Sequence, residues 1–293
     1  MLTLEAATYR AVPVVPDTVR EGPLEAAAFM GRLLGEEAER ACAHGNLAPR
    51  DVTANLCVST MMDLPFATGW LRWPDIRTAA ERHTRFAPHN FTAAYECAGW
   101  GFALAYARRH CWPGAAIVIH VVDLNLFDIS FWCGNPDWGH SGFGISSVVL
   151  RVPESGEFVV EAKASQSSYH MGEFCVALRK WLAASDSLSA NTPFLPTGMV
   201  GIYDHFLPGG RIMPDLHARF GHCFGSDTWL SFITHLQDGL LRRGGHYTAT
   251  SASLRGYWAM TDLRIAEDGL FGFVDERGEM SRSEIAREME ASA

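Results

Sequence analysis

Short runs of apolar residues alternate with longer segments of helical periodicity along most of this chain. Ala115 to Val122 is apolar and rich in β-branched residues, which predicts a buried strand. Pro23 to Cys42 instead places its leucines and alanines near one face, opposite Glu and Arg, which predicts a helix. The same reasoning predicts strands at 2–15, 51–60, 142–152, 157–164, 199–207, 247–253 and 257–265, and helices at 98–109, 172–184, 211–220 and 228–243.

This alternation of strands and helices favours an α/β fold with helices on the faces of a sheet. The two sides of a seam near residue 155 repeat roughly the same order of elements, although no sequence identity relates them. The pattern therefore predicts two pseudo-duplicated halves, 1–155 and 156–293. After Ala266 the chain becomes polar and charged, and we expect a tail there with a short terminal helix.

The segment from Met61 to Asn90 departs from the alternation. It carries Phe66, Trp70 and two further large aromatic residues among prolines and charges, and it is longer than an ordinary connection. Such an excursion either lines a site or an interface, or forms a surface flap with a small hydrophobic cluster of its own. The sequence leaves both interpretations open.

The chain is organised around the stretch from Phe91 to Arg109, which places Cys97 at the start of a helix that is apolar on all sides. A helix of this kind is expected to be buried. A thiol at its first turn lies at the positive end of the helix dipole, which stabilises the nucleophilic thiolate. The competing interpretation is a small apolar core residue, because free cysteines are often buried.

Composition narrows the classes of protein that fit. Hydrophobic residues make up 48% of the 293 positions and charged residues 19%, which excludes a mostly disordered chain. The net charge of −9 argues against a nucleic-acid partner, since no basic surplus exists to neutralise phosphates. The seven cysteines are scattered without a CxxC pair, and neither a signal peptide nor a bilayer-spanning run is visible, so we expect a cytoplasmic protein with reduced thiols and no membrane association.

Four segments in order resemble the thiolase-like condensing enzymes, and most closely the β-ketoacyl-ACP synthase III type. Glu96-Cys97-Ala98-Gly99 and the following residues resemble the nucleophile segment of that family. The stretch 142–150, GFGISSVVL, resembles its glycine-rich turn and strand, at the spacing from the cysteine that the family shows. Residues 46–52 resemble its helix-to-strand corner, and 204–208, DHFLP, resembles the segment before its catalytic histidine.

The resemblance implies a thiolase-like α/β fold whose two halves form a layered α/β/α/β/α core. It implies an acyltransferase or ketosynthase-like enzyme that accepts an acyl group from acyl-CoA or an acyl carrier protein onto Cys97, with no cofactor or metal beyond the thioester substrate. It also implies a dimer, with the 61–90 excursion at the interface. The positions expected to contact substrate are Phe66, Trp70, Trp100, Gly209 and Gly256, and the backbone amides near Cys97 and Gly256 are expected to form the oxyanion hole.

Two departures bear on the chemistry. Gly209 stands where the family has a histidine, and His222 stands where it has an asparagine. Those two side chains stabilise the enolate of decarboxylative condensation in the family, so that reaction is in doubt here. Acyl transfer needs only a nucleophile and a base, and His222 or His205 would supply the imidazole. Both histidines also have ordinary interpretations, as a loop residue and as a strand-end residue.

A carboxylate at Glu96, where the family has a small residue, would raise the pKa of the neighbouring thiol unless it points away. Two functions therefore stay open. One is an enzyme of specialised, polyketide- or fatty-acid-like biosynthesis that transfers or condenses an acyl group through Cys97. The other is a non-catalytic subunit, similar to a chain-length factor, that pairs with an active condensing enzyme. The retained Cys97 favours the first and the missing histidine at Gly209 favours the second.

Overall fold

The structure is a computed structural model that describes residues 1–207, 211–275 and 277–280. Its longer strands are β1 (Leu2–Ala11), β2 (Val52–Val58), β3 (Asn90–Thr92), β4 (Ala116–Asp123), β7 (Gly144–Arg151), β8 (Val160–Ala164), β9 (His246–Ala252) and β10 (Tyr257–Val274). Two short strands, β5 (Gly134–Asn135) and β6 (Gly139–His140), pair with each other. The α-helices are α1 (Pro23–His44), α2 (Asp63–Ala67), α3 (Trp73–Ala80), α4 (Gly99–Ala107), α5 (Ser130–Cys133), α6 (His170–Ala184), α7 (Thr197–Phe206), α8 (His217–Phe220) and α9 (Asp227–Gln237). The 3-10 turns are η1 (Asp17–Arg20), η2 (Pro49–Asp51), η3 (Glu96–Ala98) and η4 (Phe224–Ser226).

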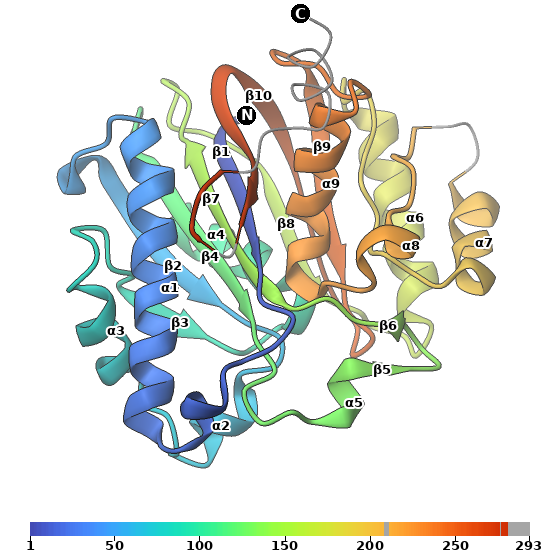
Figure 1. The fold of residues 1–293 in the computed structure, drawn as a ribbon. Coiled ribbons are helices and arrows are strands. Elements are labelled where there is room, and N and C mark those ends of the chain that lie inside the picture. Colours follow the sequence, from blue (N-terminus) through green and yellow to red (C-terminus); the bar gives the residue numbers. More distant parts are fainter. Residues whose placement is uncertain (208–210, 276, 281–293) are drawn as a thin grey trace, which may run out of the picture.

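The eight longer strands form one connected sheet in the order β3-β2-β4-β7-β1-β10-β8, and β9 pairs with β10 (Figure 1). The first five strands of that order come from before residue 155 and the others from after it. Strands β1 and β10 run parallel and join the two groups by hydrogen bonds. The division of the chain into halves at residue 155 stays a prediction.

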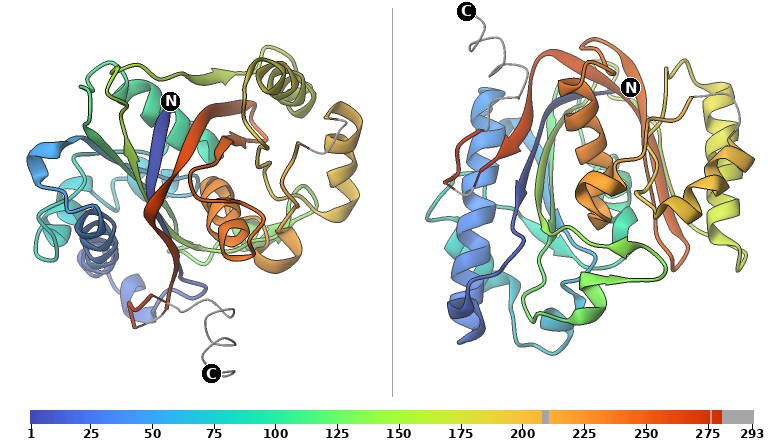
Figure 2. Two further views of the ribbon diagram at one scale, coloured as in Figure 1. Left: turned by 90° about the horizontal axis from the view of Figure 1, so that it is seen from above. Right: turned by 45° about the vertical axis from the view of Figure 1, so that its right-hand side comes forward.

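Five layers result, because each strand group is covered on both faces. Alternate side chains of β4 show this: Ile117 and Ile119 pack against the central helices, whereas Val118 faces the opposite way into the cluster that contains α1 residues. Helices α1 and α3 cover the outer face of the first strand group, and α6 and α7 cover the outer face of β9 and β10 (Figure 2). The predicted α/β/α/β/α arrangement is confirmed.

Helices α4 and α9 form the central layer. Both are buried, and their indole rings Trp100 and Trp229 meet edge to face with centroids 5.2 Å apart. The backbones of α4 and β10 approach closely at Gly101, where a Cβ would lie 2.1 Å from that of Ala259. The apolar pattern around α4 therefore predicted its burial correctly, and this layer carries Cys97 at one end.

Four of the predicted elements differ in the structure. Residues 199–207 were predicted as a strand, but 199–206 belong to helix α7, where Met199, Tyr203 and Phe206 pack at helical spacing toward α6. The helix predicted at 211–220 forms only over α8, and the one predicted at 228–243 ends at Gln237. The region after Ala266 is not a tail at first, because β10 continues to Val274 beside β1. The predicted terminal helix lies outside the described residues.

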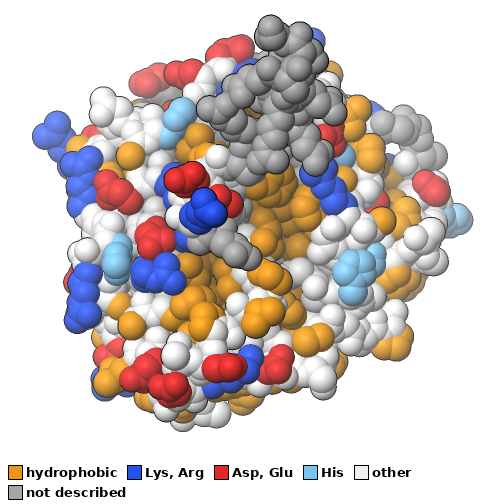
Figure 3. Space-filling view, in the orientation of Figure 1, with side chains coloured by type: hydrophobic (Ala, Val, Ile, Leu, Met, Phe, Trp, Pro, Cys, Tyr) orange, Lys and Arg blue, Asp and Glu red, His pale blue; other side chains and the backbone are white. Residues whose placement is uncertain are grey.

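The surface carries charges of both signs. On the face shown in Figure 3, acidic and basic side chains are interspersed around a band of hydrophobic side chains, and no continuous basic surface is visible there. Among the described residues, none of the helices combines the length and the hydropathy of a membrane span.

Candidate active site

Cys97 lies in the 3-10 turn η3, directly before α4. The two residues in front of it, Tyr95 and Glu96, have left-handed backbones with φ of 72° and 47°. The Ser251 hydroxyl on β9 donates a hydrogen bond of 2.6 Å to the Cys97 carbonyl. A sharp turn held in this way presents the thiol to a pocket at the end of the central layer, as the sequence predicted for its place at the start of the helix.

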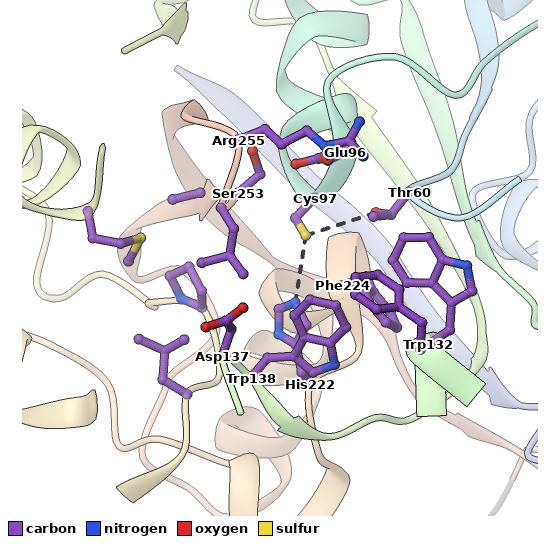
Figure 4. Close-up of a pocket in the computed structure, with 16 residues that line it drawn as sticks. Thr60, Glu96, Cys97, Trp132, Asp137, Trp138, His222, Phe224, Ser253 and Arg255 are labelled. Carbon is purple, nitrogen blue, oxygen red and sulfur yellow. Dashed lines mark hydrogen bonds and ion pairs between the residues drawn. The ribbon is translucent and has the colours of Figure 1, made fainter. Parts of the chain in front are cut away.

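His222 faces the thiol from the loop between α8 and η4. Its Nε2 lies 3.7 Å from the Cys97 Sγ, so the two side chains are hydrogen-bonded (Figure 4). The position of the ring is fixed by its backbone, because the His222 amide donates to the His140 carbonyl at 2.8 Å and its carbonyl accepts from the Gly142 amide at 3.0 Å. The glycine-rich turn that the sequence singled out before β7 thus anchors the histidine.

Asp227 completes the array from the first residue of α9. Its Oδ2 lies 2.8 Å from His222 Nδ1, and the two side chains are almost fully buried, with exposed fractions of 4% and 8%. The carboxylate also accepts the backbone N–H groups of Cys223 at 2.7 Å and Phe194 at 3.0 Å. These contacts fix the carboxylate in place at the start of α9. Thiol, imidazole and carboxylate therefore lie in one hydrogen-bonded line.

The electrostatics of this line differ from the sequence expectation. Burial raises the pKa of the Cys97 thiol, and the hydrogen bond and charge of His222 offset that only in part. The helix dipole alone does not activate the thiol. For His222, burial lowers the pKa, but Asp227 and Cys97 outweigh it and hold the pKa well above its ordinary value. The raised pKa makes His222 an effective acceptor for the thiol proton, so a thiolate at Cys97 depends on the His222–Asp227 pair.

The pocket at Cys97 has a volume of about 220 Å³ and a mostly apolar lining. Its aromatic wall comes from the 131–138 segment and η4, namely Phe131, Trp132, Trp138 and Phe224. Figure 4 shows Trp132, Trp138 and Phe224 on one side of the thiol and the Glu96–Arg255 pair on another. Such a pocket suits an apolar group placed against the Cys97 Sγ.

Asp123, at the end of β4, holds two of the segments around Cys97 by hydrogen bonds. Its Oδ1 accepts the Thr60 amide at 2.6 Å and the Ser59 hydroxyl at 3.2 Å, and its Oδ2 accepts the Gly225 amide at 3.3 Å. Thr60 in turn places its hydroxyl 4.0 Å from the Cys97 Sγ. Burial raises the pKa of Asp123 to about 6, against these hydrogen bonds.

The structure brings together two of the predicted site residues, Cys97 and His222, and places the other described ones, His205, Phe66, Trp70, Trp100 and Gly256, outside the pocket lining. His205 lies on an exposed part of α7 and not at a strand end, because its segment is helical. Phe66 stacks on Phe91 with centroids 4.3 Å apart, and Trp70 packs edge-on against Phe127 at 4.8 Å. Both rings therefore pack against the apolar cluster beneath α1, outside the pocket at Cys97.

Three further predicted contacts have different outcomes. Trp100 is fully buried against Trp229 and does not line the pocket. The Gly256 amide donates a hydrogen bond of 3.0 Å to the Ser253 carbonyl. Its N–H group is therefore already hydrogen-bonded and does not serve as an oxyanion donor in this structure. Gly209 lies outside the described residues.

Sequence reasoning missed Asp227 and the aromatic wall. Asp227 stands five positions after His222 and directly before the predicted helix 228–243, so an acidic residue at a helix start was the available signal. The wall residues come from a loop without regular periodicity, and only the tertiary structure shows which of them face the thiol. Within the described residues, no group of three or more His, Cys, Asp and Glu side chains is arranged to hold a metal ion.

Fold and site together define a class, an α/β protein of five layers with a buried Cys–His–Asp array at the end of the central helices. No family model matches the chain, and no curated protein sequence matches it. Solved structures match it closely in fold. The chain has the thiolase-like fold of the 3-oxoacyl-(acyl carrier protein) synthase III enzymes and their structural relatives, as the sequence resemblance predicted.

Three of these structures illustrate the similarity. The acyltransferase ChlB3 is 14% identical with a TM-score of 0.63, over 92% of this chain and 98% of its own. The synthase III of Pseudomonas aeruginosa is 17% identical with a TM-score of 0.59, over 90% and 98%. The tetronic acid condensing enzyme AbyA1 is 15% identical with a TM-score of 0.60, over 89% and 98%. At these identities the comparison shows the fold alone.

Proposed function

We propose that this protein is an acyltransferase that carries its acyl group as a thioester on Cys97. The observation that carries the proposal is the line from Cys97 through His222 to Asp227 in an apolar pocket. A nucleophile, a base and a group that orients the base are the parts that covalent acyl transfer requires. The structural neighbours include an acyltransferase and condensing enzymes, which supports a ketosynthase-like reaction class.

In the first half-reaction, Cys97 passes its proton to His222 Nε2, and the thiolate attacks the carbonyl carbon of a thioester. The new C–S bond forms, the old one breaks, and the leaving thiol of CoA or a carrier protein takes the proton back from Nε2. In the second half-reaction, His222 removes a proton from an alcohol, amine or thiol that attacks the acyl-cysteine. The proton then returns to the Cys97 Sγ. Asp227 stabilises the imidazolium in both halves.

Transfer to a nucleophile is favoured here over decarboxylative condensation. The paired carboxylate makes His222 a proton acceptor for the thiol, whereas condensation needs two oriented donors toward an enolate oxygen. His222 stands where the family carries one of those donors, and its other ring nitrogen is held by Asp227. The Cys97 backbone amide as an oxyanion donor stays a prediction.

The proposal is tested by incubating the purified protein with acyl-CoA and acyl-carrier-protein thioesters and measuring the intact mass. An adduct that Cys97→Ala abolishes and that Cys133→Ser retains supports acyl transfer, because Cys133 is exposed and lies outside the pocket lining. Absence of an adduct from every donor, together with co-purification of a larger synthase, would support the alternative of a non-catalytic partner subunit.

We also propose, from the fold, that the chain acts as a homodimer or a heterodimer with a second thiolase-fold subunit. Strand β3 ends the order of the sheet, and a groove beside it is lined by the aromatic residues Phe91, Tyr95, Phe102 and Tyr106. Light scattering coupled to size-exclusion chromatography distinguishes a dimer from a monomer. A monomer at micromolar concentration, without a co-purifying partner, would contradict this part of the proposal.

A further inference from the structure

The turn that presents Cys97 holds two consecutive non-glycine residues, Tyr95 and Glu96, in the left-handed region. Side chains with a Cβ adopt this region rarely, and such turns persist only where the surroundings hold them. The contacts that hold a turn of this kind decide where its nucleophile points. The elements that contact residues 95 to 97 therefore bear on the position of the thiol.

The β9–β10 hairpin contacts the turn at all three residues. The Tyr95 ring stacks on Phe102 at 3.9 Å and meets Tyr257 of β10 edge-on at 5.5 Å. The Ser251 hydroxyl donates to the Cys97 carbonyl. Between these contacts, Arg255 Nε lies 2.9 Å from Glu96 Oε1 (Figure 4).

The ion pair is asymmetric in its exposure. The Glu96 side chain is 17% exposed, whereas the Arg255 side chain is 76% exposed and approaches from the hairpin tip. Glu96 directly precedes Cys97 and lines the same pocket. An unpaired carboxylate there disfavours the thiolate, and it does so more strongly when it is shielded from water. Neutralising that carboxylate requires a cation that stays beside it.

The other charged and titratable groups near the thiol do not supply that cation at Glu96. His222 faces Sγ from the loop before η4 and is paired with Asp227 of α9. Asp123 approaches from β4 and Asp137 lines the pocket from the β5–β6 turn, and both are acidic. Among the described residues that line the pocket, Arg255 is the only lysine or arginine.

We propose that Arg255 is a positioning residue for Cys97, which holds the strained turn through Glu96 and neutralises the carboxylate that would otherwise oppose the thiolate. The inference rests on Cys97 being the nucleophile of the proposed function. It explains how the chain accommodates a glutamate directly before that cysteine. Arg255 acts through Glu96 and has no role in bond making.

The experiment measures the rate of iodoacetamide alkylation of Cys97 from pH 5 to 11. Tryptic peptide 86–108 holds Cys97 as its only cysteine, so mass spectrometry reports this thiol without changes to the other six. The variants are Arg255→Gln, Glu96→Gln and the double variant. Arg77→Gln is the matched control, because Arg77 forms a partly exposed ion pair with Glu81 outside the pocket.

Arg255→Gln leaves Glu96 unpaired, so we expect its pH midpoint to rise by about half to one unit and its rate near neutrality to fall about three- to tenfold. Glu96→Gln removes the opposing charge, and the double variant is expected within about twofold of Glu96→Gln. A purely structural role for Arg255 would give no such rescue. An unchanged midpoint in Arg255→Gln, or a double variant as slow as Arg255→Gln, overturns this inference.

Different results would refute Cys97 as the nucleophile and Arg255 as its positioning residue. If wild-type Cys97 reacts no faster than a free peptide thiol at any pH, the nucleophile itself is refuted and this inference falls with it. If wild-type Cys97 reacts rapidly and the Arg255 variant matches it, only the role of Arg255 is refuted.

Discussion

Replacement of Asp227 by asparagine tests the proposed chemistry most directly. The change keeps the size of the side chain and removes its charge. The new side chain would retain one oxygen, which we expect to accept the Cys223 amide as Oδ1 does now at 2.7 Å. Its NH₂ group would then face His222 Nδ1 and the Phe194 amide, where Oδ2 now accepts. The imidazole would turn to the tautomer with its proton on Nε2, which faces Sγ and accepts no proton from the thiol.

The magnitude follows from the burial of the pair. Both side chains are at most 8% exposed, so water screens the interaction weakly. Breaking a buried ion pair by removing one partner costs about 3–5 kcal/mol, and the retained hydrogen bond reduces this to roughly 2–4 kcal/mol. If that loss appears in the transition state, the rate falls by about 30- to 1,000-fold.

The assay is the same alkylation of peptide 86–108, combined with the rate of acyl-adduct formation. In the wild type, the raised pKa of His222 makes it an acceptor for the thiol proton, so we expect the alkylation rate to follow the protonation of His222 as well as that of Cys97. In Asp227→Asn the alkylation rate is expected to rise with pH as it does for an ordinary thiol. Asp238→Asn is the control, because Asp238 follows α9 and pairs with the partly exposed Arg219 at 4.0 Å.

Asp227→Asn is also expected to change how the stability of the fold depends on pH. The folded-state pKa of His222 lies above its unfolded value, so its pairing with Asp227 contributes fully below about pH 6.5 and is lost as pH rises through the raised pKa. The wild type is therefore expected to be more stable to unfolding than Asp227→Asn near neutral pH, and this difference in the free energy of unfolding is expected to shrink at alkaline pH. Rates within threefold of the wild type and an unchanged pH profile would refute the triad.

The remaining predictions concern the support of the site and the packing of the central layer. Burial raises the pKa of Asp123 to about 6 from 3.8, so its ionisation destabilises the fold as pH rises between those values, by about 3 kcal/mol at most. Urea unfolding at pH 4 and 7.5 should show that the free energy of unfolding of Asp123→Asn, relative to that of the wild type, is higher at pH 7.5. An equal difference between the two proteins at both pH values would contradict this assignment. Gly101→Ala should destabilise by about 1–3 kcal/mol, because its Cβ would lie 2.1 Å from the Cβ of Ala259. Gly201→Ala on α7, where a Cβ meets nothing within 4 Å, should be neutral or stabilising by up to about 1 kcal/mol, and equal thermal shifts for the two glycines would contradict the packing argument.

The hydrophobic pattern was sufficient to predict the type and burial of an element where apolar residues occupied nearly all of its positions. Strand β4 is apolar apart from His120 and Asp123, and α4 is apolar on all sides, so their types and burial follow from the order of residues alone. The pattern was insufficient at α7. Val200, Ile202 and Tyr203 are common strand residues, but contacts with α6 stabilise the helix, so tertiary packing overrides their propensity.

The α/β class, the position of Cys97 before a buried helix, and His222 as a candidate partner all follow from the order of residues. The surroundings of that thiol become visible only in the folded chain. The side chains that meet there come from positions as distant as Thr60 and Arg255, and sequence separation says nothing of which loops converge. Asp227 became part of the site because α9 lies beside α4 in the central layer, which aims its first residue at His222. In the proposed mechanism, the activation of Cys97 depends on the buried His222–Asp227 pair, whose interaction is strong because the fold excludes water from it.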